Sequence, residues 1–91
     1  MSRIPKKNPD IIWKNLKGET VLLNPATGSY YGLNRAGCSF WEKADGYRSI
    51  AEIESLMLEE FNVERERLAK DLSDLIKTLS ENGLVTLSDQ T

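Results

Sequence analysis

Cys38 is the one cysteine in a sequence of 91 residues that contains no histidine. Histidine is the commonest general base and the commonest metal ligand, and a lone thiol has no base or second thiol to act with. Zinc and iron–sulfur sites with the usual nitrogen and sulfur ligands are therefore excluded. No spacing among the acidic residues resembles a calcium loop. The residues predict a chain with no catalytic residue, no metal site and no cofactor.

The composition is that of one soluble globular domain, with 40% hydrophobic and 29% charged residues and a net charge of −2. No apolar run is long enough to form a transmembrane helix, and Met1–Asp10 lacks the apolar segment of a secretory signal. A single cysteine cannot form an internal disulfide, which fits a reducing compartment. Cys38 itself lies between Gly37 and Ser39, where a small, partly buried residue fits. We expect a cytoplasmic protein without a membrane partner.

The most informative stretch runs from Asn24 to Trp41 and reads NPATGSYYGLNRAGCSFW. Asn24 and Pro25 start a turn, which Gly28 can close because glycine readily adopts a positive φ. Residues 29–33 follow as a short strand rich in aromatics, and Asn34 is a suitable N-cap for a helix. A strand that ends a hairpin and leads directly into a helix is expected at the edge of a sheet. Such an edge can bind an extended peptide.

The other strands complete a small meander. Residues 11–16 and 19–24 read as strands joined by a two-residue turn at Lys17-Gly18, and residues 29–33 add the third strand. The preceding segment, residues 1–10, carries three cations and two prolines without periodicity. We interpret it as a flexible N-terminal tail, rather than a binding arm, ahead of a domain at residues 11–88.

Three helices are predicted after the meander. The first spans residues 35–44, and the second begins at Ser49, which forms an S-x-x-E capping box with Glu52. The third spans residues 65–82 and ends at Gly83, with Leu84 placed for the apolar contact of a Schellman motif. Val85 and Leu87 could form a short final strand. The predicted fold is α+β and winged-helix-like, a three-stranded antiparallel sheet followed by three helices.

Two segments, LNPATGSYYGLNRAGCSFWEKADGYRSIAEI and DLSDLIKTLSENGLV, resemble the PqqD family, whose fold is known as the RiPP recognition element. The resemblance covers residues 11–85. Its most specific parts are Leu33-Asn34, Gly46-x-x-Ser49-x-x-Glu52-Ile53, Asp71 and Gly83-Leu84.

The resemblance implies a non-catalytic protein of natural-product biosynthesis. Members of the family bind the leader of a ribosomally synthesised precursor peptide and present it to a modifying enzyme, often a radical SAM enzyme or a leader peptidase. The turn and the tyrosines of this sequence differ from the same region of the members that act in pyrroloquinoline quinone synthesis. They look more like stand-alone recognition proteins of lasso-peptide or other radical-SAM clusters, which leaves the precursor open.

The resemblance also implies where the peptide binds. In the family the leader adds as a strand to the third strand, in the groove beside the third helix. Carried over to this chain, the candidate peptide-binding residues are Ser29, Tyr30, Tyr31, Gly32 and Leu33 on the strand, with Leu68, Asp71, Leu72 and Leu75 on the helix. The strand contains no Lys or Pro that would oppose pairing, and Gly32 allows a close approach of another backbone.

Structural roles compete with these assignments. The two tyrosines could serve packing alone, and the three leucines of the helix are expected to be core residues whose rim alone faces a groove. Asp71 could pair with Arg67 on the helix surface. The unguarded edge could also pair with its own copy, so the chain is predicted to be a monomer or a weak homodimer.

Two other functions are open. A winged-helix-like fold suggests DNA binding, but the net charge of −2 and the mixed charges of the third helix lack the clustered cations that phosphates require. We therefore expect no nucleic-acid partner. The other alternative is an adaptor that binds only a protein partner through the second helix, which carries Glu52, Glu54, Glu59 and Glu60 without Lys or Arg. A solvated helix face is the simpler interpretation of these glutamates.

Overall fold

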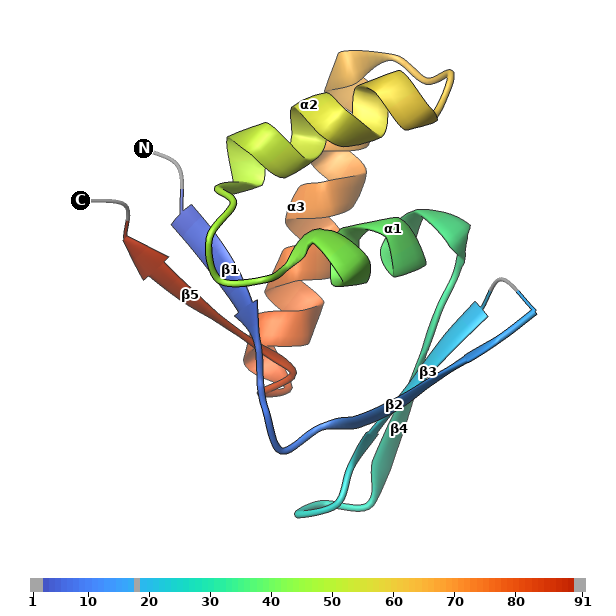
Figure 1. The fold of residues 1–91 in the computed structure, drawn as a ribbon, viewed down its shortest axis with the longest axis vertical. Helices are drawn as coiled ribbons and strands as arrows, with labels where there is room; N and C mark the ends of the chain where they lie inside the picture. The colour runs from blue at the N-terminus through green and yellow to red at the C-terminus, as the bar shows by residue number, and fades with distance from the viewer. Residues whose placement is uncertain (1–2, 18, 90–91) are drawn as a thin grey trace.

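The computed structural model describes residues 3–17 and 19–89, which form two small antiparallel sheets and three helices (Figure 1). The elements are β1 (Arg3–Lys7), β2 (Ile12–Leu16), β3 (Glu19–Asn24), β4 (Ser29–Leu33), α1 (Arg35–Lys43), α2 (Ile50–Glu60), α3 (Arg65–Glu81) and β5 (Val85–Asp89). The predicted α+β class and the meander β2–β3–β4 followed by three helices are confirmed. None of the described helices is long and apolar enough to span a bilayer.

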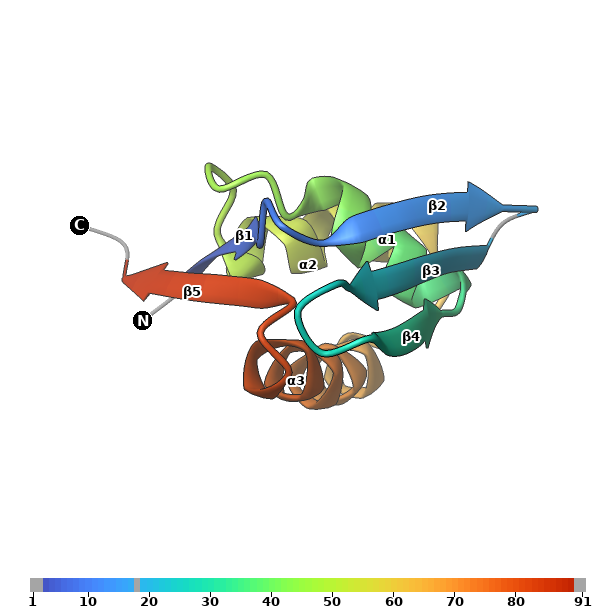
Figure 2. The same cartoon turned by 90° about the horizontal axis from the view of Figure 1, so that it is seen from below.

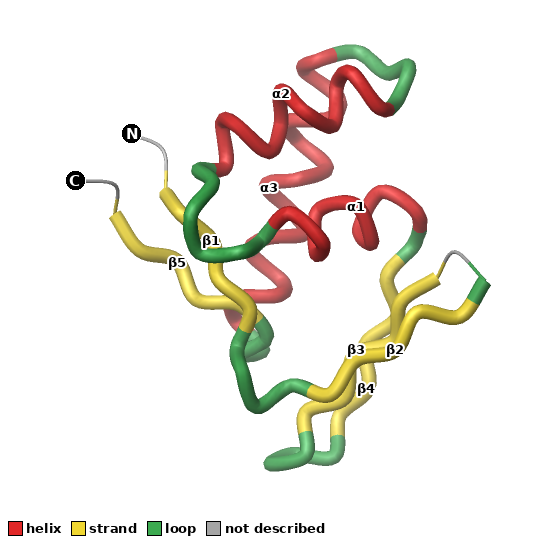
Figure 3. Tube along the Cα trace, in the orientation of Figure 1, coloured by secondary structure: helices red, strands yellow, loops and turns green. Residues whose placement is uncertain are grey.

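The N-terminal segment departs from the prediction. Residues 3–7 were expected to belong to a flexible tail, but they form β1, which pairs antiparallel with β5 from Arg3↔Asp89 to Lys7↔Val85. Pro5 is fully buried, and its carbonyl accepts the N–H of Gly46 at 3.1 Å. Figure 3 shows this second sheet apart from the meander, joined to it by the loop after β1. The tail prediction is wrong for residues 3–7, because the partner strand lies at the other end of the chain; residues 1–2 lie outside the described part.

The β3–β4 hairpin has the predicted turn. The Asn24 side chain accepts the N–H of Ala26 at 3.0 Å, and the Asn24 carbonyl accepts the N–H of Gly28 at 2.7 Å. Gly28 has a φ of +74°, which favours glycine. The β2–β3 turn includes Gly18, so that prediction falls outside the described residues.

The helix ends follow the local capping signals. Asn34 Oδ1 accepts the N–H of Gly37 at 2.9 Å, and Ser49 Oγ accepts the N–H of Glu52 at 3.2 Å. At the end of α3 the N–H of Leu84 donates to the carbonyl of Leu79 at 2.9 Å, while Gly83 takes a φ of +70°. This hydrogen bond and this positive φ are those of a Schellman motif. They direct the chain from α3 back into β5.

The core lies between the helices and the inner face of the meander. Trp41 and Phe40 of α1 are fully buried, together with Leu22 of β3 and Ile53 of α2. Cys38, which was expected to be partly buried, is buried, and its Sγ lies 3.5 Å from the Leu33 carbonyl oxygen. Burial of this kind supplies most of the stability of a small domain.

Lys7 connects β1 to this core. Its ammonium lies 5.9 Å from the ring centroid of Trp13 and 5.7 Å from that of Trp41, within cation–π range. The two rings meet edge to face with centroids 6.3 Å apart. Partial burial lowers the pKa of Lys7, while Asp45 and Glu42 oppose that effect. The cation–π contact of Lys7 with Trp41 thus helps to hold β1 against α1.

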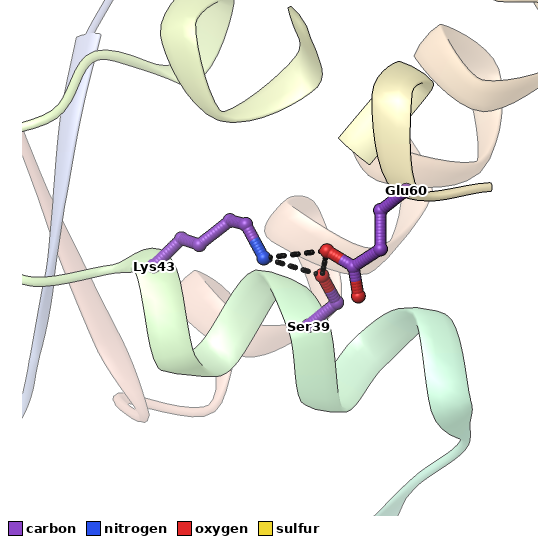
Figure 4. A network of polar contacts seen from close by, with 3 residues as sticks. All are labelled: Ser39, Lys43 and Glu60. Carbon is purple, nitrogen blue, oxygen red and sulfur yellow. Dashed lines mark hydrogen bonds and ion pairs between the residues drawn. The ribbon is translucent and has the colours of Figure 1, made fainter. Parts of the chain in front are cut away.

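A polar network joins α1 to α2 (Figure 4). Lys43 Nζ lies 2.8 Å from Glu60 Oε2 and 2.8 Å from Ser39 Oγ, and the Ser39 hydroxyl donates to Glu60 at 3.0 Å. The hydrogen bond from Lys43, and then that from Ser39, lowers the pKa of Glu60. The network stabilises the folded state when Glu60 is ionised.

We predict that Glu60→Gln destabilises the protein by at most about 1 kcal/mol at pH 7, because the carboxylate is partly exposed to solvent. A carboxyl group whose pKa is lower in the folded state stabilises that state above its unfolded pKa of about 4.3. The difference between the two proteins should disappear as the pH falls through the folded pKa. Urea unfolding at pH 7 and pH 3 measures it, with Glu59→Gln as the control. A constant difference across this range would contradict the prediction.

Candidate functional site

β4 forms the edge of the meander on the side of α3. The strand order is β2–β3–β4, and Figure 2 shows β4 between β3 and α3. β4 therefore has β3 on one side and no paired strand on the other within the described residues. Its second edge is available for hydrogen bonding.

The turn before β4 determines which backbone groups reach this edge. The bond from Gly28 N–H to the Asn24 carbonyl shows that Asn24 directs its carbonyl toward β4. Backbone groups alternate in direction along a strand, so every second residue back from Asn24 also points toward β4.

Leu22 belongs to this alternating set and pairs with Tyr31. Tyr31 therefore directs its backbone groups inward to β3. Its neighbours Tyr30 and Gly32 consequently direct theirs outward, away from the sheet. An added strand would find these N–H and C=O groups unpaired.

A pocket of about 240 Å³ lies at the start of β4, under the C-terminal end of α3. Three of the predicted site residues line it: Ser29, Tyr30 and Tyr31. The remaining lining residues come from the β3–β4 hairpin and from the end of α3: Asn24, Thr27, Glu81, Asn82 and Leu84. We call this the lower pocket.

A second pocket of about 340 Å³, the upper pocket, lies beyond the other end of β4. All four predicted residues of α3 line it: Leu68, Asp71, Leu72 and Leu75. The other lining residues come from the start of α1 and the α2–α3 connection: Asn34, Ala36, Gly37, Phe61 and Val63. Gly32 and Leu33 lie on the strand between the two pockets.

The burial of the helix residues agrees with their expected double role. Leu68 and Leu72 are buried in the core, and Leu75 is partly buried. Each therefore presents only part of its side chain to the upper pocket. Leu33 is likewise buried, so its contribution to the edge is its backbone.

Asp71 differs from its neighbours because it is exposed at the rim of an otherwise mostly apolar pocket. The described residues show no ion pair between Asp71 and Arg67, the alternative that its helical spacing allowed. Its carboxylate can therefore accept a hydrogen bond or a cation from a bound molecule.

Sequence reasoning missed the contribution of the α2–α3 connection. Phe61, at the end of α2, and Val63, just after it, were not among the predicted site residues. The Arg35 guanidinium lies 5.5 Å from the centroid of Phe61, which holds that ring near the start of α1. The signal available in the sequence was the pair of apolar residues, Phe61 and Val63, between the second and third helices, but their placement at the pocket required the tertiary structure.

Among the described residues, no group of three or more His, Cys, Asp or Glu side chains is placed to hold a metal ion. The site consists instead of an open strand edge flanked by two pockets. These features suit an extended chain whose backbone pairs with β4 and whose side chains enter the pockets.

The comparisons with known proteins define the class. The family profile of Coenzyme PQQ synthesis protein D (PqqD) matches residues 19–85, and the chain belongs to this family. No curated protein matches the sequence.

Two solved structures are similar to this chain. One is TbiB1 in complex with the TbiA(beta) leader peptide, at 28% identity and a TM-score of 0.79, covering 88% of this chain and 93% of that one. The other is a lasso peptide synthetase B1 complexed with the leader peptide, at 25% identity and a TM-score of 0.79, covering 91% and 98%. Both of these structures are complexes of a protein with a leader peptide.

Proposed function

We propose that this protein binds the leader of a ribosomally synthesised precursor peptide as a strand added to the free edge of β4. The peptide-binding residues are those of β4 and of the α3 face at the upper pocket, as assigned above. The protein then presents the peptide to a modifying enzyme, such as a radical SAM enzyme or a leader peptidase, and has no catalytic role itself. The observation that carries the proposal is an edge strand with outward backbone groups between two pockets.

The physical mechanism is an increase in effective concentration. A disordered leader that is held at β4 keeps the attached core peptide near the active site of a docked enzyme. Ordering the leader costs conformational entropy, so a strand that is already rigid limits that cost to the peptide. The β3–β4 turn and the Asn34 cap hold β4 at both ends before any peptide binds. We propose that this occurs in the cytoplasm and that the protein acts as a monomer or a weak homodimer.

The adaptor alternative is weaker with the fold in view. The acidic face of α2 was expected to lack counter-charges, but Glu60 pairs with Lys43, and Glu54 lies 3.4 Å from Arg65. Glu52 belongs to the capping box. Three of the four glutamates thus have structural partners, which is the simpler role for this helix.

Amide chemical shifts of labelled protein, titrated with the synthetic leader of any small peptide encoded beside its gene, test the proposal. We expect saturable changes in residues 29–33 and along the α3 face of the upper pocket. A scrambled leader of the same composition is the control. Changes confined to α2 would favour the adaptor instead. Saturable binding of duplex DNA with a steep salt dependence would favour DNA binding.

A further inference from the structure

Gly32 lies inside β4, but neither its backbone conformation nor the packing of the chain around it requires a glycine. Its φ is not among the positive values of the described residues, which occur at Lys17, Gly28, Gly46 and Gly83. A Cβ added to Gly32 would meet no described atom within 4 Å beyond its chain neighbours. Glycine weakens a strand interior because it has no side chain to pack and loses more conformational freedom on folding.

Gly37 shows the contrasting case. A Cβ on Gly37 would lie 3.1 Å from the Cβ of Leu33, so close packing within the chain explains that glycine. No such contact explains Gly32. The missing side chain at Gly32 therefore leaves space that no described residue occupies, and that a bound molecule could use.

This space opens on the outer face of the meander, away from the helices. Leu22 is buried on the inner face, so its neighbour Val21 lies on the outer face. Val21 is the register partner of Gly32, and Tyr30, two residues before Gly32, lies on the same face and is 74% exposed. Gly32 is thus a notch with an aromatic ring and an aliphatic side chain as its neighbours.

The notch continues into a shallow apolar depression of about 240 Å³ across the same face. Its lining is mostly aliphatic and aromatic: Ile12, Trp13, Lys14, Leu16, Val21, Leu23 and Tyr30. Ile12, at 58% exposure, belongs to the same cross-strand row as Leu23 and Tyr30. This apolar row ends at the free edge of β4, where an added strand would extend it.

We infer that the outer face is a second contact surface for the leader, which places a large apolar side chain, aromatic by preference, over Gly32. The inference rests on the proposed function. Residues of an added strand that lie directly opposite Gly32 share its face, because cross-strand partners point the same way. An aromatic side chain next to an edge glycine can cover the exposed backbone and contact both neighbours of the notch.

The leader is a better occupant of this surface than a second copy of the chain. A face of three strands, two of five residues and one of six, measures on the order of 200 Å², from spacings of about 3.3 Å per residue and 4.8 Å per strand. A stable dimer buries about 800 Å² on each partner. An added strand needs only the edge, and its side chains necessarily alternate between the groove and this face.

Gly32→Val tests the inference, because valine fills the notch but keeps the outward N–H. Valine also favours strands, so we expect the unfolding midpoint to stay the same or rise. The affinity for the synthetic leader that shifts residues 29–33 of wild type should fall about tenfold or more, because the leader side chain loses its space. Thr86→Val, at an exposed position of β5 in the other sheet, should bind within about twofold of wild type. Calorimetric titration of the three proteins measures the difference.

The same titrations separate this inference from the proposed function. An alanine scan of the leader should identify one residue whose truncation weakens binding to wild type but has no further effect on Gly32→Val. If wild type binds the leader while Gly32→Val binds equally well, the outer-face contact is refuted and edge binding stands. If wild type does not bind the leader, both are refuted. Should Gly32→Val fail to fold, Val21→Thr decides, because Val21 lines the outer face but neither of the two groove pockets. Weaker leader binding by this variant supports the outer-face contact, and unchanged binding refutes it.

Discussion

Replacing Gly32 with proline is expected to weaken leader binding roughly 30- to 150-fold, because proline removes an edge N–H and leaves a carbonyl of the leader unpaired, at a cost of about 2 to 3 kcal/mol. The Gly32 N–H points away from β3, so its loss breaks no hydrogen bond of the sheet. Proline is tolerated on edge strands for this reason. Calorimetric titration with the leader measures the loss, and circular dichroism checks the fold.

The matched comparison for proline is Gly32→Val. Both side chains occupy the notch, but valine keeps the N–H, so the loss for proline must exceed the loss for valine. Equal losses of leader affinity would mean that filling the notch causes the whole effect. They would contradict a hydrogen bond from the Gly32 N–H to the leader. A folded proline variant with unchanged affinity would refute strand addition at this edge altogether.

Removing residues 1–7 is expected to lower the free energy of unfolding by about 3 kcal/mol or more, a large fraction of the stability of a small domain. The deletion takes away β1, exposes Val85 on β5 and uncovers the Trp41 side of the core by removing Lys7. Urea unfolding followed by tryptophan fluorescence gives the difference.

The control for the deletion is Lys6→Gln, which removes one cation of the segment but keeps the strand. Lys6 is exposed, so the substitution should change the unfolding free energy by no more than about 0.5 kcal/mol. A truncated protein with the wild-type midpoint would restore the interpretation of this segment as a tail. Weaker leader binding by Lys6→Gln at unchanged stability would instead indicate a basic binding arm.

Several local features could be predicted because each depends on residues close together in sequence. The turn at Gly28, the cap at Asn34 and the Ser49–Glu52 capping box are satisfied within a few residues. The helical periodicity likewise predicted the buried face of α3. The edge position of β4 was predicted because this strand ends a hairpin and leads directly into a helix. These signals do not require knowledge of the rest of the chain.

The long-range features required the tertiary structure. β1 has a partner 78 to 86 residues later in the chain, from Lys7↔Val85 to Arg3↔Asp89, and five residues carry too little pattern to predict such a pairing. The counter-charges of α2 come from α1 and α3.

The candidate site combines both kinds of information. The amino-acid sequence by itself determined the turns, the caps, the absence of histidine and the strand that carries the candidate site. Only the tertiary structure decided which side chains surround that strand, and that the space at Gly32 opens on the apolar outer face. The physical reason is that hydrogen bonds at turns and caps are made between near neighbours. Pockets and notches instead arise where separate elements meet, and their shape depends on how those elements pack.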